Sequence, residues 1–343
     1  MKPLTYRDAG VDIEAGDEAV RRLAPHAQGT TRPEVIGKIG AFASFVRVPA
    51  GYTAPVLVSS TDGVGSKLKV AFLTGRHDTV GIDLVAMNVN DILVHGAEPL
   101  YFLDYIGVGR VDPARIERIV AGVAEGCTRA GCALVGGEIS EMPDIYAKGE
   151  YDLVGFAVGV VDADRIIDGR AVQPGDVVLG LASSGLHSNG FSLARRIVFD
   201  VLRLPLDAEL DGTGRTVADE FLEPTRIYVR PIRRLLAEIS VRAMAHVTGG
   251  GVLGNLPRVL PEGCRAMLRR DAWHVPPVFE ALRKAGHVAD DEMLRTFNMG
   301  IGYVVVVSPG DADRAFAVLT QTGETVSRIG EITAGPRGVE ILS

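Results

Sequence analysis

The sequence lacks the features that mark secreted and membrane proteins. Its 343 residues include only three cysteines, Cys127, Cys132 and Cys264, and none of them forms a CxxC pair. An odd number of cysteines without that spacing indicates neither a disulfide framework nor a zinc site, and it is typical of a reducing compartment. The longest strongly apolar run, around residues 304–307, is far shorter than the roughly 20 residues that span a bilayer. With no apolar signal segment near the N-terminus either, we expect a cytoplasmic protein that contacts no membrane.

An excess of basic residues is also missing. The formal net charge is -7 and the pI is near 5.6, whereas a general nucleic-acid binder shows a basic face or stripe. We therefore expect no nucleic-acid partner, and any phosphate must be bound by a local site. Aromatic residues make up only 6% of the chain, but hydrophobic residues make up 47%, which is ample for a folded core.

The length and the order of the apolar segments predict two domains of mixed α/β (α+β) architecture. A chain of 343 residues exceeds the usual size of one core. Apolar runs typical of strands alternate with segments of helical periodicity, at irregular spacing. Turn residues cluster from Asp168 to Asp176, so we place the domains at residues 1–168 and 169–343. The strands expected in the first domain are 55–58, 100–106, 132–135 and 151–161, and its clearest helices are 82–94 and 112–131.

Residues 59–99 carry the first candidate site. They follow the run 55–58, which we expect to be a buried strand, and in the helix 82–94 the side chains of Asn88 and Asp91 lie on one stripe. A carboxylate in apolar surroundings needs a partner. For Asp91 that partner is a metal or, at about even odds, Arg76 or a helix end that it caps.

Two acids around a glycine turn predict a nucleotide and metal site. Oxygen ligands from Asp62 and Asp91 suit Mg²⁺. Free backbone N–H groups at Gly63 and Gly65, with the ammonium of Lys67, suit the phosphates of a nucleotide. A magnesium-bound polyphosphate is therefore the favoured ligand.

A third acid, Glu138, follows two glycines. The segment Gly136-Gly137-Glu138 comes directly after the strand expected at 132–135. Alone it would be a turn with a solvated acid. Beside the other two acids, Glu138 becomes a third candidate ligand of the metal.

Polar glycine loops recur in the second half. The segment Ser183-Ser184-Gly185-Leu186-His187-Ser188-Asn189-Gly190 lies between an expected strand, 177–181, and an expected helix, 191–199. This order is typical of anion sites, because the N–H groups at a helix N-terminus favour negative charge. Ser188 or Asn189 could equally cap the helix, whereas His187 has no evident structural role.

A further glycine loop follows His246 and Thr248 and consists of residues 249–251. A lone histidine at such a place is more often a satisfied core or turn group than a catalytic one. Thr296 and Asn298, in the segment 296–300, could face either a cleft or solvent.

Taken in order, these motifs resemble the aminoimidazole ribonucleotide synthetases, also called phosphoribosylformylglycinamidine cyclo-ligases, over nearly the whole chain. A D-x4-G-A-x-P element marks a wider ATP-dependent superfamily, and the other segments in this order point to the cyclo-ligases. The segments are Tyr6–Ile13, Ser60–Gly65, Asp91–Pro99, Gly136–Glu138, Ser183–Gly190, Pro224–Val229, His246–Gly251 and Thr296–Gly300.

The resemblance implies that formylglycinamidine ribonucleotide and ATP are converted to aminoimidazole ribonucleotide, ADP and phosphate. ATP is expected to phosphorylate the formyl oxygen, after which an amidine nitrogen attacks that carbon and phosphate leaves. Such chemistry depends on positioning and charge neutralisation more than on a protein nucleophile.

The resemblance also suggests roles for the candidate residues. As a hypothesis, Asp62, Asp91 and Glu138 hold Mg²⁺, and His187, Asn189 and His246 contact the substrate and transfer protons. The expected nucleotide contacts are Asp62, Gly63, Gly65, Lys67, Asn88, Gly137, Ser188, Thr248, Thr296 and Asn298. By the same analogy, the first domain pairs with that of a second copy, so that a homodimer forms a barrel-like sheet, and the active site lies in the cleft between the domains.

Other functions fit the motifs less completely. A thiamine-phosphate kinase would share Asp62 and the Asp91 element but should lack the 187–189 loop, and a selenophosphate synthetase would need a reactive residue near its N-terminus. A hydrogenase-maturation protein would end in cysteine, whereas this chain ends in Ser343. A regulator that senses ATP without turnover stays open, and release of phosphate separates it from the ligase.

Overall fold

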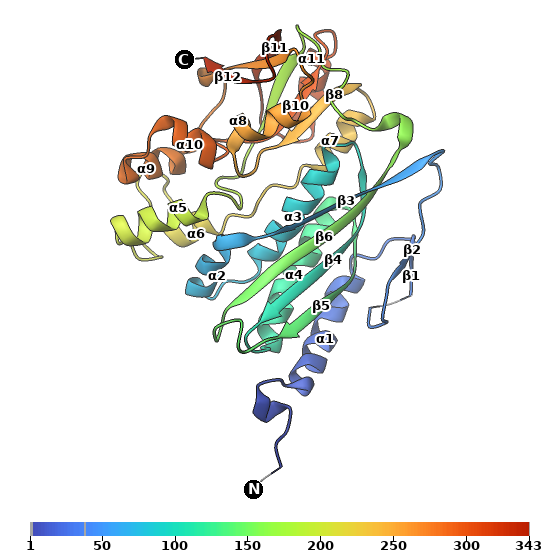
Figure 1. Ribbon diagram of the computed structural model, residues 1–343, viewed down its shortest axis with the longest axis vertical. Coiled ribbons are helices and arrows are strands. Elements are labelled where there is room, and N and C mark those ends of the chain that lie inside the picture. Colours follow the sequence, from blue (N-terminus) through green and yellow to red (C-terminus); the bar gives the residue numbers. More distant parts are fainter. Residues whose placement is uncertain (1–2, 38, 343) are drawn as a thin grey trace.

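The computed structural model describes residues 3–37 and 39–342 and shows two α/β halves, each built on one large sheet (Figure 1). This confirms the prediction of a mixed α/β fold in two halves. The last strand of the first sheet ends at Asp162, and the first strand of the second sheet begins at Val177. In the described part of the chain, no helix is long and apolar enough to cross a membrane.

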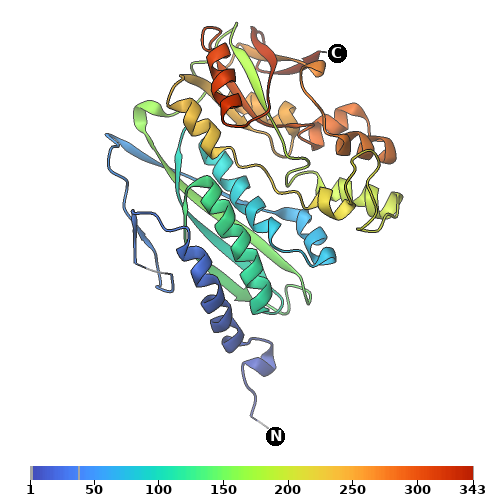
Figure 2. The same cartoon turned by 180° about the vertical axis from the view of Figure 1, so that it is seen from behind.

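The first sheet has the strand order β3-β6-β4-β5, in which β4 and β5 are parallel and the other neighbours are antiparallel. Its strands are β3 (Pro55–Gly63), β6 (Tyr151–Asp162), β4 (Glu98–Val108) and β5 (Ala133–Glu141). Helices α1 (Ile13–Gln28), α3 (Thr79–Leu93) and α4 (Pro113–Ala130) cover one face of the sheet (Figure 2). The short helix α2 (Leu68–Thr74) follows β3, and β1 (Val35–Ile36) pairs with β2 (Phe45–Val46).

Helix α4 is bounded by the residues that the sequence singles out. The Asp112 carboxylate accepts from the N–H groups of Ala114 and Arg115, and Pro113 takes the first helical position. Gly81 of α3 meets α4 at a close crossing, where a Cβ would lie 2.4 Å from the Ile119 carbonyl oxygen. This crossing fixes α3 against the sheet, and α3 in turn carries several residues of the site.

The opposite face of the first sheet carries exposed apolar side chains. Leu57 of β3 and Phe156 of β6 point to this face and are 57% and 40% exposed. The prediction that residues 55–58 form a buried strand is therefore half wrong, because the strand forms but, among the residues that the structure describes, no layer covers this face of it (Figure 1). Glu138 also lies inside β5 and not beyond the end of a strand.

The second sheet has the order β12-β9-β11-β7-β10-β8. The strand β10 is buried along its whole length between antiparallel β7 and β8. The strands are β7 (Val177–Ala182), β8 (Val241–His246), β9 (Cys264–Arg269), β10 (Ile301–Val307), β11 (Val326–Ala334) and β12 (Gly338–Leu342). The helices are α5 (Phe191–Arg195), α6 (Val217–Phe221), α7 (Val229–Leu236), α8 (Gly251–Asn255), α9 (Pro277–Gly286), α10 (Asp290–Thr296) and α11 (Ala312–Gln321).

Candidate active site

Asp62 and Asp91 approach each other at the boundary between the two halves. Asp62 lies at the end of β3 and Asp91 in the last turn of α3. Burial raises the pKa of the Asp62 carboxyl, and the negative charge of Asp91 raises it further. Two carboxylates in this arrangement repel each other unless a cation lies nearby, so the pair is a candidate cation site.

His246, at the end of β8 in the second half, is hydrogen-bonded to Asp91. The imidazole Nδ1 lies 2.8 Å from Asp91 Oδ1, and the Asn90 amide nitrogen lies 3.5 Å from Nε2. Since the amide nitrogen can only donate, Nε2 is the acceptor and Nδ1 carries the proton that it donates to Asp91. The predicted pairing of Asp91 with Arg76 is wrong, because Arg76 pairs with Asp219, and the Asp91 carboxylate bonds His246 in place of a helix end.

Three polar residues on one stripe of α3 contact the second half. Asp83, Asn90 and Asp91 are spaced at i, i+7 and i+8 and so lie on neighbouring positions of the helix surface. Asp83 accepts from Thr225, Asn90 bonds the backbone of residues 226 and 228, and Asp91 bonds His246. The stripe predicted from the sequence contains Asp91 and Asn88 but not Asp83 and Asn90, although the i, i+7, i+8 spacing identifies both.

A small cavity of about 280 Å³ lies beside the Asp91–His246 pair. Its polar lining combines the Asp91 carboxylate and the His95 and His246 imidazoles with the guanidinium of Arg258, a residue outside the motifs found in the sequence. Ser59 and Ser60 from β3 and Asn255 from α8 complete the polar lining. The cavity therefore offers both acidic and basic groups to a small polar ligand.

Glu138 lies at the other side of the first sheet. Asp62 is paired with Gly155, Gly155 with Asp104, and Asp104 with Gly137, so these four residues form one row across the sheet. Three strand spacings separate its ends by about 14 Å. Within residues 3–37 and 39–342, no group of three or more acidic, histidine or cysteine side chains is arranged to hold a metal. A single chain therefore does not assemble the predicted triad of Asp62, Asp91 and Glu138.

A second and larger cavity, of about 760 Å³, contains Gly137 and Glu138 in its lining. It lies between β4, β5, α1 and the segment 39–44, and much of its surface is apolar. The carboxyl of Asp104 also lines it, and Asp104 Oδ2 is buried with no hydrogen-bond partner in the part of the chain that the structure describes. Burial raises the pKa of Asp104 to about 7. Asp104 was not predicted as a site residue, although it is a lone acid in an apolar run.

Lys67 does not face a ligand site. Its side chain is wholly buried, its ammonium lies 2.9 Å from Asp83, and it donates to the carbonyl oxygens of His187 and Glu223. An ammonium with these acceptors would have to leave them to bind phosphate. The structure therefore argues against the predicted phosphate contact of Lys67.

His187 is a buried neutral ring. It is 1% exposed, and burial lowers the pKa of its imidazole well below the ordinary value. The Ser184 N–H donates to Nε2 at 3.1 Å, so the proton is on Nδ1. Because Nε2 already accepts this bond, the neutral ring presents no free lone pair to a substrate, which argues against the predicted proton transfer by His187. The Ser188 hydroxyl bonds Asp83 and Thr225, so it neither caps α5 nor is free for a nucleotide.

Three other predicted nucleotide contacts have internal partners instead. Asn298 is 4% exposed and its amide bonds Ser183, Gly185 and Gly300. Asn88 is buried and donates to the carbonyl oxygens of Leu84 and Asp62. The Thr296 hydroxyl bonds Glu292. These three side chains shape the loops and helices around the site.

The remaining predicted residues stay accessible near the boundary. Gly65, in a left-handed conformation with φ of 70°, has open space where a Cβ would stand, and Gly63 donates its N–H to Asp62 Oδ1. Thr248 is half-buried beside Asn255. Asn189 Oδ1 lies 3.6 Å from the position of a Cβ on Gly249, so the two glycine loops of the second half meet.

Comparisons with known proteins agree with this architecture. The family model described as AIR synthase related protein, N-terminal domain, matches residues 43–161, and the corresponding C-terminal domain model matches residues 173–343. A phosphoribosylformylglycinamidine cyclo-ligase of Anaeromyxobacter dehalogenans is 57% identical over 337 residues, which is 98% of this chain and 97% of the relative. One of Citrifermentans bemidjiense is 53% identical over 340 residues, covering 99% and 98% of the two chains.

The chain belongs to the phosphoribosylformylglycinamidine cyclo-ligase family. This cyclo-ligase fold is shared with distant solved structures. Thiamine-monophosphate kinase of Stenotrophomonas maltophilia superposes with a TM-score of 0.68 at 19% identity, covering 94% of this chain and 95% of the kinase. The hydrogenase maturation protein HypE in complex with ATP gives 0.66 at 20% identity, covering 95% and 90%. At such identities the likeness shows the fold alone.

Proposed function

We propose that the chain is an ATP-dependent cyclo-ligase that converts formylglycinamidine ribonucleotide to aminoimidazole ribonucleotide, with release of ADP and phosphate, in purine synthesis. Full-length identity above 50% to proteins named as this enzyme carries the proposal. The pairing of Asp91 with His246 and the nearby Asp62 supply groups that this chemistry needs.

Asp62 and Asp91 fit Mg²⁺ as ligands. Protein sites usually offer this ion one or two carboxylates and leave the other positions to water and nucleotide phosphates. The raised pKa of Asp62 means that its negative charge is unfavourable in the protein alone. A bound cation would offset that charge. When bound, Mg²⁺ would neutralise the charge on the ATP phosphates during transfer.

His246 is the residue that we assign to proton transfer. Its Nδ1–H donates to Asp91, which fixes the tautomer. The lone pair on Nε2 has only a long contact, at 3.5 Å, with the Asn90 amide nitrogen. A neutral imidazole held in this way accepts a proton from the amidine nitrogen as that nitrogen attacks the activated formyl carbon. Arg258, in the same cavity, supplies a guanidinium suited to the phosphate of the ribonucleotide.

The cavity that contains Asp104 fits the base of ATP. Its apolar lining suits a flat ring, and the unpartnered Oδ2 of Asp104 suits the exocyclic amino group of adenine. A buried carboxylate at this point would disfavour guanine, which carries a carbonyl oxygen at that ring position.

A homodimer would explain both the bare sheet face and the distance of Glu138 from the other acids. Exposed apolar side chains on one face of β3 and β6 call for a covering layer. If two such sheets closed into a barrel, β5 of one copy would lie beside β3 of the other and bring Glu138 toward Asp62. The composite site would then contain acids from both chains.

The cytoplasmic location stays a prediction.

The test is ADP formation by the purified protein with Mg²⁺, ATP and formylglycinamidine ribonucleotide. The cyclo-ligase requires that ADP, phosphate and an aminoimidazole product appear together, and only when the ribonucleotide is present. ATP binding without ADP release would instead support a nucleotide sensor. Turnover with thiamine phosphate in place of the ribonucleotide would support a kinase.

A further inference from the structure

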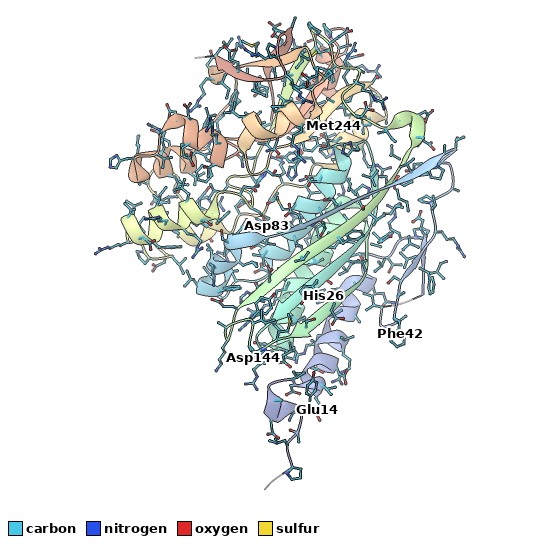
Figure 3. The ribbon with its side chains drawn as sticks, in the orientation of Figure 1. Glu14, His26, Phe42, Asp83, Asp144 and Met244 are labelled. Carbon is cyan, nitrogen blue, oxygen red and sulfur yellow. The ribbon has the colours of Figure 1, made fainter. Side chains whose placement is uncertain are left out.

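One buried ion pair of the first half bonds loops of the second half and takes no direct part in the proposed chemistry. Lys67 lies just after β3. Asp83 lies in the first turns of α3 (Figure 3), against the loops that precede α5 and follow α6 in the second half. Both side chains are fully buried, with the ammonium 2.9 Å from the carboxylate.

The second half contributes most of the remaining partners of this pair. Lys67 donates to the carbonyl oxygens of His187 at 2.9 Å and of Glu223 at 2.6 Å. Asp83 Oδ1 accepts from the Thr225 N–H and hydroxyl, both at 2.7 Å, and from the Ser188 hydroxyl at 3.1 Å. A buried ion pair is weak evidence for stability, because its desolvation cost offsets its attraction. Its dense set of partners from two segments of the second half, residues 187–188 and 223–225, points to a geometric role instead.

The loop that the pair holds has an unfavourable backbone conformation. His187 has a φ of 59°, in the left-handed region that non-glycine residues rarely adopt. Its carbonyl oxygen is held by Lys67, and the next side chain, Ser188, is held by Asp83. The following residue, Asn189, lies beside Gly249 in the segment that begins at His246. The pair therefore fixes the loop at the carbonyl of its strained residue and at the residue that follows it.

We propose that Lys67 and Asp83 are positioning residues that hold the 183–190 loop, and with it Asn189, beside the His246–Gly251 segment for turnover. This inference rests on the proposed cyclo-ligase function. Neither residue contacts substrate in this account, and both act through the backbone and side chains of the loop.

The test uses the double variant Lys67→Met with Asp83→Asn. Lys67→Met alone would leave a buried carboxylate without its counter-charge, whereas the amide introduced by Asp83→Asn is neutral and keeps an oxygen for Thr225. We expect hydrogen exchange of amides 184–189 to rise at least about tenfold. We also expect kcat to fall about 10- to 100-fold, since a misplaced loop costs rate, while the Kd for Mg²⁺–ATP changes by less than about threefold.

The matched control is Lys69→Met, which removes a neighbouring lysine from a partly exposed pair with Glu150 and should change neither readout. Unchanged exchange in the double variant, or faster exchange with wild-type kcat, would overturn the inference. If the double variant does not fold, Ser188→Ala removes one loop contact, and smaller changes of both readouts are then required. If the wild-type protein releases no ADP with the ribonucleotide, the proposed function fails, and the exchange of 184–189 still decides whether the pair holds the loop.

Discussion

His246 Nδ1 donates a 2.8 Å hydrogen bond to Asp91 Oδ1 across the boundary between the two halves. The imidazole side chain is almost completely buried, whereas the carboxylate is 42% exposed. The bond therefore links a group that can move a proton to a group that can still reach a ligand. It also makes the geometry of the site depend on the contact between the two domains.

Replacing His246 by Asn should separate binding from turnover. The amide can still donate to Asp91, but it cannot accept and release a proton near neutral pH. We expect kcat to fall by about 10² to 10⁴, with a change of less than about threefold in the Kd for ATP. Steady-state ADP release and equilibrium binding measure the two quantities. A kcat within a factor of about two of the wild-type value would exclude His246 from proton transfer.

Replacing Asp104 by Asn should change how stability depends on pH. The folded-state pKa of about 7 lies above the ordinary value of 3.8, so folding disfavours the charged carboxyl. The contribution of Asp104 to the free energy of unfolding therefore falls as pH rises from about 4 to about 7 and then levels off. Without ligand, the variant should unfold at a higher temperature than the wild-type protein at pH 8 and lose this advantage by pH 4. An offset that is the same at both pH values would contradict the assigned titration.

The variant Asp104→Asn should also weaken the preference for adenine over guanine. If the Asp104 carboxylate accepts from the adenine amino group, Asp104→Asn should weaken ATP binding about 5- to 50-fold and narrow the preference for ATP over GTP. Competition binding with both nucleotides is the measurement, and Glu117→Gln, a change of a surface acid on α4, is the control. An unchanged ratio of the two Kd values would remove the base from this cavity.

Two inactive variants should restore activity when their chains are mixed, provided that each site combines acids from two copies. Asp91→Asn and Glu138→Gln are each expected to be inactive. A mixed dimer would carry one intact site, so random mixing should return about a quarter of the wild-type activity. Co-expression with different tags, followed by an ADP assay, makes the comparison. Activity no higher than that of the separate variants would mean that Glu138 does not join the Asp91 site of a second chain.

The sequence predicted elements better than it predicted burial. The Asp112-Pro113 start and the Gly131 end of α4 follow from local chemistry, and both are found. Strand 55–58 was expected to be buried, but an apolar run does not reveal whether the same chain supplies the covering layer. The glycines before Glu138 predict a strand end, but Gly137 lies within the sheet, where a Cβ would collide with the Asp104 carboxylate. The requirement for glycine at position 137 becomes visible only once Asp104 is known to pack against it.

The structure brings together only some of the residues predicted for the site, again because the sequence does not show which groups are neighbours in space. Asp62, Asp91 and His246 come together as acids and bases at the ends of elements. Lys67, His187 and Asn298 have the residue types of ligand contacts, but their partners are other loops of the same chain. A sequence without spatial neighbours cannot distinguish a polar group that holds a loop from one that holds a substrate.

The most direct test of the account is the Mg²⁺ dependence of ADP release, with the ribonucleotide present, in the wild-type protein and in Asp91→Asn. The account predicts that turnover of the variant falls at least about 100-fold at the Mg²⁺ concentration that saturates the wild-type protein, and that added Mg²⁺ recovers part of it. Full turnover of Asp91→Asn at that same concentration would contradict the assignment of the carboxylate pair to the metal.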